Sequence, residues 1–413
     1  MAYRKAIFFV PVRFGDFNRF ANQLLSTGMW NAVDGEKIAP RYLLSYAVRI
    51  AKDQTLFRAF DIKKECIPDI YVFEKELNLK QSPVINNVRF SCFSTGVGFL
   101  EFRLEFSGMS AEEIADFSYL FKKAAKMNGK EMPEGKVSLH NAAKSLLPSG
   151  GDGEIFFTAS ADFKYECLAF HYIQLQQNDN KSAEADFRLT LLKRSYNSSF
   201  GQSADSDYDM IYKPYSNDHW GGSTEGLVNI SYDTDPDEEN YFLRNYKEEH
   251  LSVDYYFMYL LLLNQRFSAI QYILEIAEGA DSGKNEMETI NKRIVRLKTV
   301  FSFRIISDDQ IFQNVYAKMY KVLDIDCLLE DIRDNENQSE LLMNISSAKV
   351  EKRSNQFLLG ISLLSLFSAL IDASSYFDRI NFLRPVATSL GFLCTILVFV
   401  FCAIMLFVNR RKK

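Results

Sequence analysis

The chain has 413 residues, of which 47% are hydrophobic and 24% are charged, and its formal net charge is −5. This length is sufficient for two or three units with cores of their own. The mildly acidic charge provides no broad positive surface, so duplex nucleic acid is not an expected partner. The six cysteines form no Cys-x-x-Cys pair, which argues against a zinc site or a redox motif.

Residues 1–240 are predicted to form an α/β (or α+β) cytosolic regulatory domain, because strand-like and helix-like segments alternate irregularly. A buried strand is expected at 6–12, with no signal-peptide segment before it. The segments 88–93 and 99–106 flank a glycine-containing turn and predict a β-hairpin. The sequence Ser110-Ala111-Glu112-Glu113 is a capping box that begins a helix.

A turn-rich segment at 217–226 is the candidate ligand site of this domain. His219 and Trp220 are available for stacking on a base, and the segment offers backbone amides, including those of Gly221 and Gly222. The alternative is a plain structured turn. The chain contains no phosphate-binding glycine loop and no nucleophile–base arrangement, so an enzyme is not expected.

Residues 241–356 are predicted to form a helical stalk. Apolar residues beyond Asp308 follow a seven-residue spacing that is typical of a coiled coil: Val315, Val322, Leu329, Met343, Val350 and Phe357, with Ile325 and Ile332 between. We expect one continuous helix from Asp308 to Ile371, and self-association into a homo-oligomer. Acidic residues gather on its upper part (Asp324, Asp326, Glu330, Asp331 and Asp334), as a solvated helix face or as a divalent-cation site.

Two apolar segments near the C-terminus predict two transmembrane helices. The first is 357–372 and the second is 387–408. The second has about the 20 residues that a bilayer requires. The link 373–386 is expected outside the cytoplasm, and 409–413 forms a basic cytoplasmic tail. Seven basic residues flank the outer ends of the pair and two lie in the link, which places both termini in the cytoplasm. The expected location is the inner (cytoplasmic) membrane, with the lipid bilayer as a partner.

The first apolar segment carries polar residues on one helix face: Ser362, Ser365, Ser368, Asp372 and Ser375. A polar stripe in a membrane helix usually faces protein or water, which predicts a pore lining. Asp372 would raise the local cation concentration at the pore mouth. The alternatives are that the small serines allow close helix packing and that Asp372 marks the membrane interface.

This arrangement resembles the CorA superfamily of divalent-cation transporters. In that family a cytosolic α/β domain leads into a long helix that becomes the pore-lining membrane helix, a second helix returns, and five subunits assemble. The diagnostic Gly-Met-Asn motif is absent, because 372–377 reads Asp-Ala-Ser-Ser-Tyr-Phe. In its size, its enlarged domain and its missing motif, the sequence is similar to a branch of this superfamily that is associated with type III CRISPR antiviral defence.

The resemblance implies a homo-oligomeric, pentameric membrane ion channel that is gated by a ligand on its cytosolic domain, with a nucleotide second messenger as the candidate ligand. One alternative is a divalent-cation transporter for magnesium or cobalt. Another is a membrane-anchored receptor or enzyme. No cofactor is expected other than divalent cations, and the sequence assigns no residues to a metal site.

Overall fold

The chain divides into two compact units, Met1–Asn335 and Glu336–Lys413. The computed structural model describes residues 3–70, 83–124, 137–149, 153–155, 167–176, 182–195, 197–199, 210–233, 242, 245–279, 284–335 and single positions between 354 and 369. The secondary structure below belongs to the first unit.

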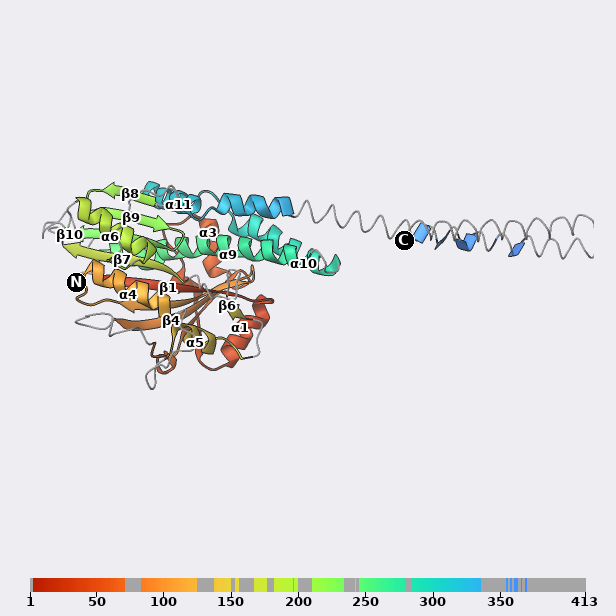
Figure 1. The fold of residues 1–413 in the computed structure, drawn as a ribbon, viewed down its shortest axis with the longest axis horizontal. Helices are drawn as coiled ribbons and strands as arrows, with labels where there is room; N and C mark the ends of the chain where they lie inside the picture. Colours follow the sequence, from red (N-terminus) through yellow and green to blue (C-terminus); the bar gives the residue numbers. More distant parts are fainter. Residues whose placement is uncertain are drawn as a thin grey trace, which may run out of the picture. The chain divides into compact units, whose positions relative to one another are not determined.

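A mixed ten-stranded sheet is the framework of the described part of this unit (Figure 1). Its strands, in spatial order, are β2 (Trp30–Val33), β3 (Phe57–Ile62), β4 (Val84–Phe93), β5 (Val97–Glu105), β1 (Arg4–Arg13), β7 (Leu168–Gln176), β10 (Gly226–Asp233), β9 (Asp218–Ser223) and β8 (Met210–Tyr215), with the short β6 (Glu154–Ile155) paired to β1. β7 and β10 run parallel, and the other described pairs are antiparallel.

Several local predictions are confirmed. The expected strand at 6–12 lies within β1, which is central in the sheet and almost wholly buried. The expected hairpin is formed by β4 and β5 around Gly96, whose positive φ of 92° is readily adopted only by glycine. In the capping box, the Glu113 amide donates to Ser110 Oγ and the Ser110 amide donates to Glu113 Oε2.

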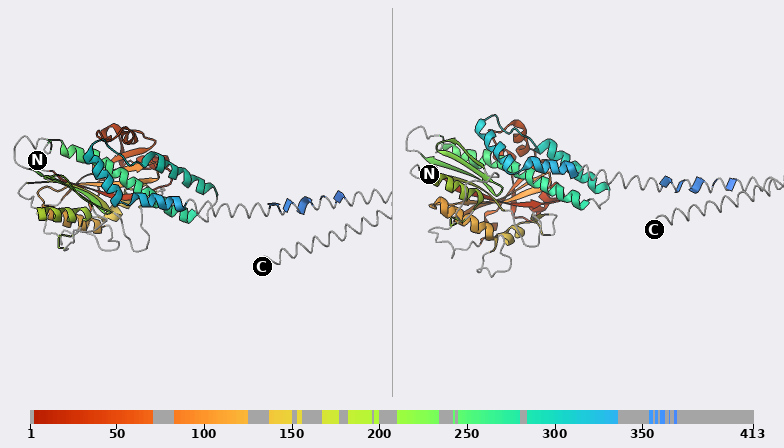
Figure 2. Two further views of the ribbon diagram at one scale, coloured as in Figure 1. Left: turned by 90° about the horizontal axis from the view of Figure 1, so that it is seen from above. Right: turned by 45° about the horizontal axis from the view of Figure 1, so that its top comes forward.

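Helices cover both faces of the sheet. The described helices include α1 (Phe17–Ser26), α2 (Gly35–Ile38), α3 (Ser45–Lys52), α4 (Ala111–Ala124), α5 (Leu139–Ser145), α6 (Ser182–Arg194), α8 (Lys247–His250), α9 (Tyr256–Gly279), α10 (Lys284–Arg296) and α11 (Gln310–Val322), together with a short 3-10 helix at Lys64–Cys66 and π-helical turns at Leu251–Tyr255 and Leu297–Phe301. Figure 2 shows α9, α10 and α11 on the opposite side of the sheet from α4, α5 and α6. Successive side chains of β1 point to opposite faces of the sheet, and each face is covered by a different helix. Phe8 contacts Phe121 of α4, whereas its neighbour Phe9 contacts Tyr259 of α9.

Helix α9 packs against the sheet over a buried polar group. Glu101 of β5 is fully buried, and it accepts hydrogen bonds from Tyr256 Oη at 2.8 and 2.9 Å, from Ser91 Oγ at 2.6 Å and from Arg103 Nη2 at 2.9 Å. Arg103 also lies over the Tyr256 ring, 4.5 Å from its centroid. Burial raises the pKa of Tyr256 to about 12, so its hydroxyl stays protonated and donates to the carboxylate.

The prediction of a continuous stalk helix from Asp308 is wrong. Helix α11 ends at Val322, and Asp324 has a positive φ of 55°, which interrupts the helix before 325–335 continues as a second one. Val315, Ile325 and Ile332 of the predicted seam are fully buried inside the first unit. Their spacing therefore reflects packing against the chain's own core, and it is not evidence for contacts with partner subunits.

The CorA-like fold with two membrane spans is contradicted, and with it the multi-pass inner-membrane location and the membrane-protein character. Among the described residues, no helix combines the length and the apolar character needed to cross a bilayer. The described chain forms instead a large mixed sheet with helices on both faces, and its most apolar helix, α9, buries 256–263 against that sheet. The predicted second span, 387–408, lies outside the described residues.

The buried His171 on β7 predicts a loss of stability in acid. Its Nε2 lies 2.9 Å from Ser118 Oγ, and burial lowers its pKa to about 3. The unfolded chain binds this proton near pH 6.5, so stability is complete above that pH and falls by about 1.4 kcal/mol per pH unit down to pH 3. The wild type should therefore lose about 2 kcal/mol of its free energy of unfolding through His171 between pH 7.5 and pH 5.0. Chemical unfolding at these two pH values should show a loss that is smaller by this amount in His171→Gln.

The half-buried His140 on α5 provides the control. Its pKa is also lowered by burial, and His140→Gln should retain most of the wild-type pH dependence. An unchanged pH dependence in His171→Gln would contradict the assignment.

Candidate functional site

The strongest candidate site is an aromatic pocket of about 530 Å³ in the first unit. Its walls come from the loop before α3, the turn between β8 and β9, the segment around α8 and the start of α11. Six rings line it: Tyr42, Tyr215, Phe242, His250, Tyr255 and Phe312. Three of them are well exposed, with relative accessibilities of 52% for Tyr42, 58% for Tyr215 and 47% for Phe242. Such exposure of large aromatic side chains around one hollow is typical of a ligand site.

The rings form a column that runs from the core to the surface. Trp220 is completely buried, and its ring centroid lies 4.4 Å from that of Tyr255. Tyr255 stacks on Phe312 at 4.0 Å with an interplanar angle of 9°. Phe312 is in turn nearly parallel to Tyr42, at 6.1 Å and 7°. The outermost ring, Tyr42, therefore has its orientation set by a rigid stack beneath it.

The loop that carries Tyr42 is held by hydrogen bonds on both sides. Asp254 Oδ1 accepts from the backbone amides of Arg41 at 2.6 Å and Tyr42 at 3.1 Å. On the other side, Ser307 Oγ donates to the Tyr42 carbonyl at 2.6 Å. Asp254 can reach the loop because Leu251–Tyr255 form a π-helical turn before α9. A single π turn in a longer helix frequently marks a functional site.

A buried ion pair forms the floor of the pocket. Lys247 Nζ lies 2.8 Å from Asp218 Oδ2, and their side chains are 6% and 3% exposed. Asp218 also accepts from Asn229 Nδ2 at 2.7 Å, and Lys247 lies over the rings of Trp220 and Tyr255. Because its charge is neutralised at short range, Lys247 presents little net positive charge to a ligand.

The polar groups of the wall are acceptors or neutral. Asp309 caps α11 by accepting from the amides of Ile311 and Phe312 through Oδ1. Burial lowers the pKa of His250, so the imidazole is neutral at pH 7, and burial raises the pKa of Asp254 against the opposing hydrogen bonds from the Tyr42 loop. The pocket is therefore suited to a planar, neutral or cationic group that donates hydrogen bonds.

Most of the predicted ligand segment at 217–226 is strand β9, and a two-residue turn at 224–225 connects it to β10, which begins at Gly226. His219, Trp220, Gly221 and Gly222 all lie in β9 and are buried. Trp220 supports the pocket from behind, since its Nε1 donates to Asp218 and its ring contacts Tyr255. A Cβ added at Gly222 would lie 2.1 Å from Met319 Sδ, so this glycine allows α11 to approach the sheet. Of this segment, Asn217 and Asp218 line the aromatic pocket, whereas the four predicted ligand residues do not.

The predicted pore residues divide at the boundary of the described chain. Ser362, Ser365 and Ser368 are helical and exposed, and Ser362 Oγ donates to the Leu358 carbonyl at 2.9 Å. Asp372 and Ser375 lie outside the described residues. The assignment of these five residues to a pore stays a prediction.

Sequence reasoning missed most of the aromatic pocket, because its rings are separated by long stretches of chain. Tyr42, Tyr215 and Phe312 come from three parts of the sequence with no shared motif. The only local signal was the density of tyrosine and phenylalanine. The position of Asp254 beside Tyr42 follows from the tertiary fold alone.

Metal binding receives no support from the described residues, in which no three His, Cys, Asp or Glu side chains come together as a cation site. In the predicted acidic group, Asp326 pairs with Arg304 at 3.1 Å and accepts from Tyr320 Oη at 3.0 Å, while Glu330 pairs with Arg333. These partners favour a solvated, ion-paired helix surface over a divalent-cation site.

Comparison with models of known protein families gives no match, and neither does comparison with curated protein sequences. The resemblance to the CorA superfamily and to its CRISPR-associated branch therefore receives no support from these comparisons.

The floor of the pocket can be tested through Asp218 and Lys247. Asp218→Asn leaves a buried ammonium without its counter-ion and should lower the free energy of unfolding by about 3–5 kcal/mol. Lys247→Met should cost a similar amount, and the double variant should recover much of the loss. Denaturant unfolding of the four proteins measures the coupling.

The exposed pair Arg13–Glu154 is the matched control, because its side chains are 41% and 64% exposed. Glu154→Gln should change stability by less than about 1 kcal/mol. Additive effects of the two single substitutions at 218 and 247 would show that the pair does not act as a unit.

Proposed function

We propose that this chain is a ligand-binding regulatory protein whose aromatic pocket takes a planar heterocycle, with a nucleobase of a nucleoside or nucleotide as the preferred class. The observation that carries the proposal is the ring column that ends in Tyr42. Nucleobases stack on aromatic side chains of this kind, and the stacking is worth about 1–3 kcal/mol per base.

The composition of the wall favours a base over other planar groups. Asn217 offers both a donor and an acceptor, while the carboxylates of Asp218 and Asp309 accept from ring N–H or amino groups. The exposed rings of Tyr215 and Phe242 provide apolar area around the stacking site. A buried planar ligand therefore finds ring faces and hydrogen-bond partners together.

The charge distribution indicates which end of a nucleotide enters. Lys247 is already paired with Asp218, and Asp309 is a second carboxylate in the wall. A phosphate inside the pocket would lie close to negative charge, so it should stay at the rim. Arg41 lies in the same loop as Tyr42, but it is 73% exposed and paired with Glu249 at 2.9 Å, so it should add little attraction for a phosphate at the rim.

A regulatory role follows from the elements that the pocket joins. The ligand would contact the Tyr42 loop, the β8–β9 turn and the first turn of α11 at once. It would therefore favour the arrangement in which α11 packs as observed, and the chain continues from α11 towards the second unit. Binding free energy at the pocket would in this way bias the segment that follows.

Of the function predicted from the sequence, we keep only the binding of a regulatory ligand to the first unit. Ion conduction depended on the membrane spans that the structure contradicts, and we do not propose it. Homo-oligomerisation and the absence of catalysis stay predictions.

Binding can be tested by calorimetry of the full chain with the four ribonucleosides and their 5′-monophosphates. We expect at least one nucleoside to bind, with its monophosphate binding no more tightly. Tyr42→Ala should weaken binding by about 5- to 100-fold through lost stacking, whereas Tyr42→Phe should keep the affinity close to that of the wild type.

Tyr46→Ala is the control, because Tyr46 is an exposed aromatic residue that contacts the Phe303 ring and is outside the pocket lining. Its affinity should match the wild type. The proposal is wrong if no nucleoside or nucleotide binds, or if Tyr42→Ala and Tyr46→Ala lose affinity equally.

A further inference from the structure

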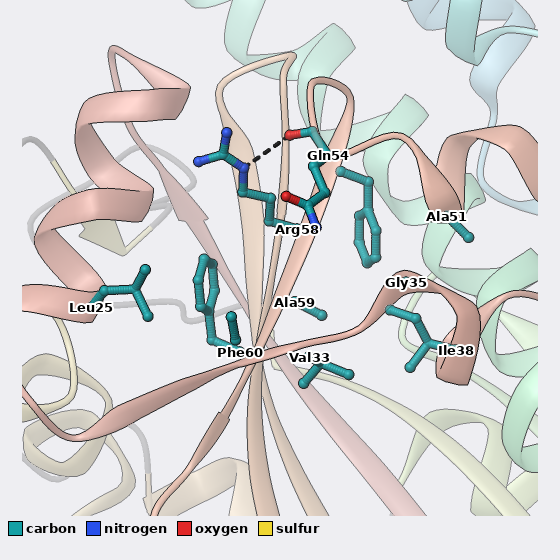
Figure 3. A pocket seen from close by; sticks show the side chains of 11 residues that line it. Leu25, Val33, Gly35, Ile38, Ala51, Gln54, Arg58, Ala59 and Phe60 are labelled. Carbon is teal, nitrogen blue, oxygen red and sulfur yellow. Dashed lines mark hydrogen bonds between the residues drawn. The ribbon is translucent and has the colours of Figure 1, made fainter.

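A second cavity, of about 220 Å³, lies at the edge of the sheet next to β2 and has no part in the aromatic pocket. Figure 3 shows its lining. Arg58 and Gln54 lie at one end, and the apolar side chains of Leu25, Phe60, Val33 and Ile38 surround the rest. The cavity is thus apolar over most of its wall and has one cationic group at its polar end.

The pairing of the strands creates this cavity. β2 pairs with β3 from Trp30 opposite Ile62 to Val33 opposite Ala59, and then the chain turns into α2. Among the described strands, residues 57 and 58 of β3 are therefore paired with β4 only. The space next to them is closed by α1, α2 and α3 instead of by a strand, and α2 lies close to α3, since a Cβ on Gly35 would be 2.6 Å from the Ala51 carbonyl oxygen.

Arg58 is held in place by neutral groups. Its Nε donates to the Gln54 carbonyl at 2.9 Å, its Nη2 donates to Asn18 Oδ1 at 2.9 Å, and its guanidinium lies over the Phe17 ring at 5.1 Å. Within the described residues no carboxylate pairs with Arg58, whereas Arg89 on the neighbouring β4 pairs with Asp61 at 2.7 Å. Nη1 is the nitrogen of Arg58 that these contacts leave for another acceptor.

We propose that this cavity binds a small monocarboxylate with an apolar tail, with the carboxylate on Arg58 Nη1 and the tail among Leu25, Phe60 and Ile38. A fixed guanidinium without a counter-ion is complementary to a carboxylate, and charge-assisted hydrogen bonds of this type are the strong ones. The apolar wall disfavours a second charge at the other end of the ligand. The volume, equal to about seven waters at ~30 Å³ each, suits a short aliphatic chain or a single ring.

This inference is independent of the nucleobase proposal, because the two cavities share no lining residue. The carboxylate could belong to a free short-chain acid or to an aromatic acid, which have the same chemistry at Arg58. Hexanoate and benzoate as probes distinguish these sources, and hexanol and benzyl alcohol are their neutral counterparts.

The experiment is a calorimetric titration of the full chain with these four probes. We expect at least one of the two acids to bind, and its alcohol to bind about tenfold or more weakly. Arg58→Gln should weaken binding of the acid to the level of the alcohol. Ala32→Leu should weaken the acid and the alcohol together, because Ala32 is an exposed wall residue and a longer side chain there fills the cavity.

Lys37→Gln is the matched control, because it removes one positive charge from the exposed surface of α2 outside the cavity lining. It should leave the affinity for the acid unchanged. If Arg58→Gln does not fold, Arg58→Lys keeps the charge but changes the hydrogen-bonding geometry, and it should still favour the acid over the alcohol. The inference is overturned if no acid binds, if the alcohol binds as tightly as its acid, or if Lys37→Gln loses as much affinity as Arg58→Gln.

Discussion

The contact between helix α9 and the central strands is the interaction on which the rest of the structure depends. Residues 256–263 are almost completely buried, and Tyr256 closes this contact by donating to the fully buried Glu101. A buried carboxylate without such donors would be strongly destabilising. The tyrosine, Ser91 and Arg103 therefore make it possible for an apolar helix to cover a strand that carries a charge.

The position of α9 also sets the geometry of the aromatic pocket. The π turn directly before it places Asp254 against the Tyr42 loop and Tyr255 against Phe312. Because these neighbours in sequence contact different walls, a displacement of α9 would change both at once. The walls of the pocket and the packing of the sheet therefore depend on the same helix, which is the physical basis for proposing a regulatory role.

The misinterpreted stalk shows why hydrophobic spacing alone was insufficient. A seven-residue repeat spans two helical turns, and it marks one apolar face whatever that face contacts. At Val315 and Ile325 this apolar face packs against the chain's own core. The positive φ of Asp324 separates α11 from the helix at 325–335. Nothing in the spacing distinguishes an intramolecular contact from a partner subunit, so self-association could not be derived from it.

The sequence by itself determined the features that depend on neighbouring residues. It located β1, the hairpin of β4 and β5 and the capping box of α4, because alternation, a glycine turn and a Ser–Glu pair act over a few residues. Only the tertiary structure decided that Trp220 supports a pocket instead of lining it, and that Tyr42, Tyr255 and Phe312 stack. It likewise decided that Arg58 faces an apolar cavity, because that depends on where β2 ends beside β3. These sites combine residues from distant parts of the chain, and their contacts arise from packing between elements that carries no local signature in the sequence.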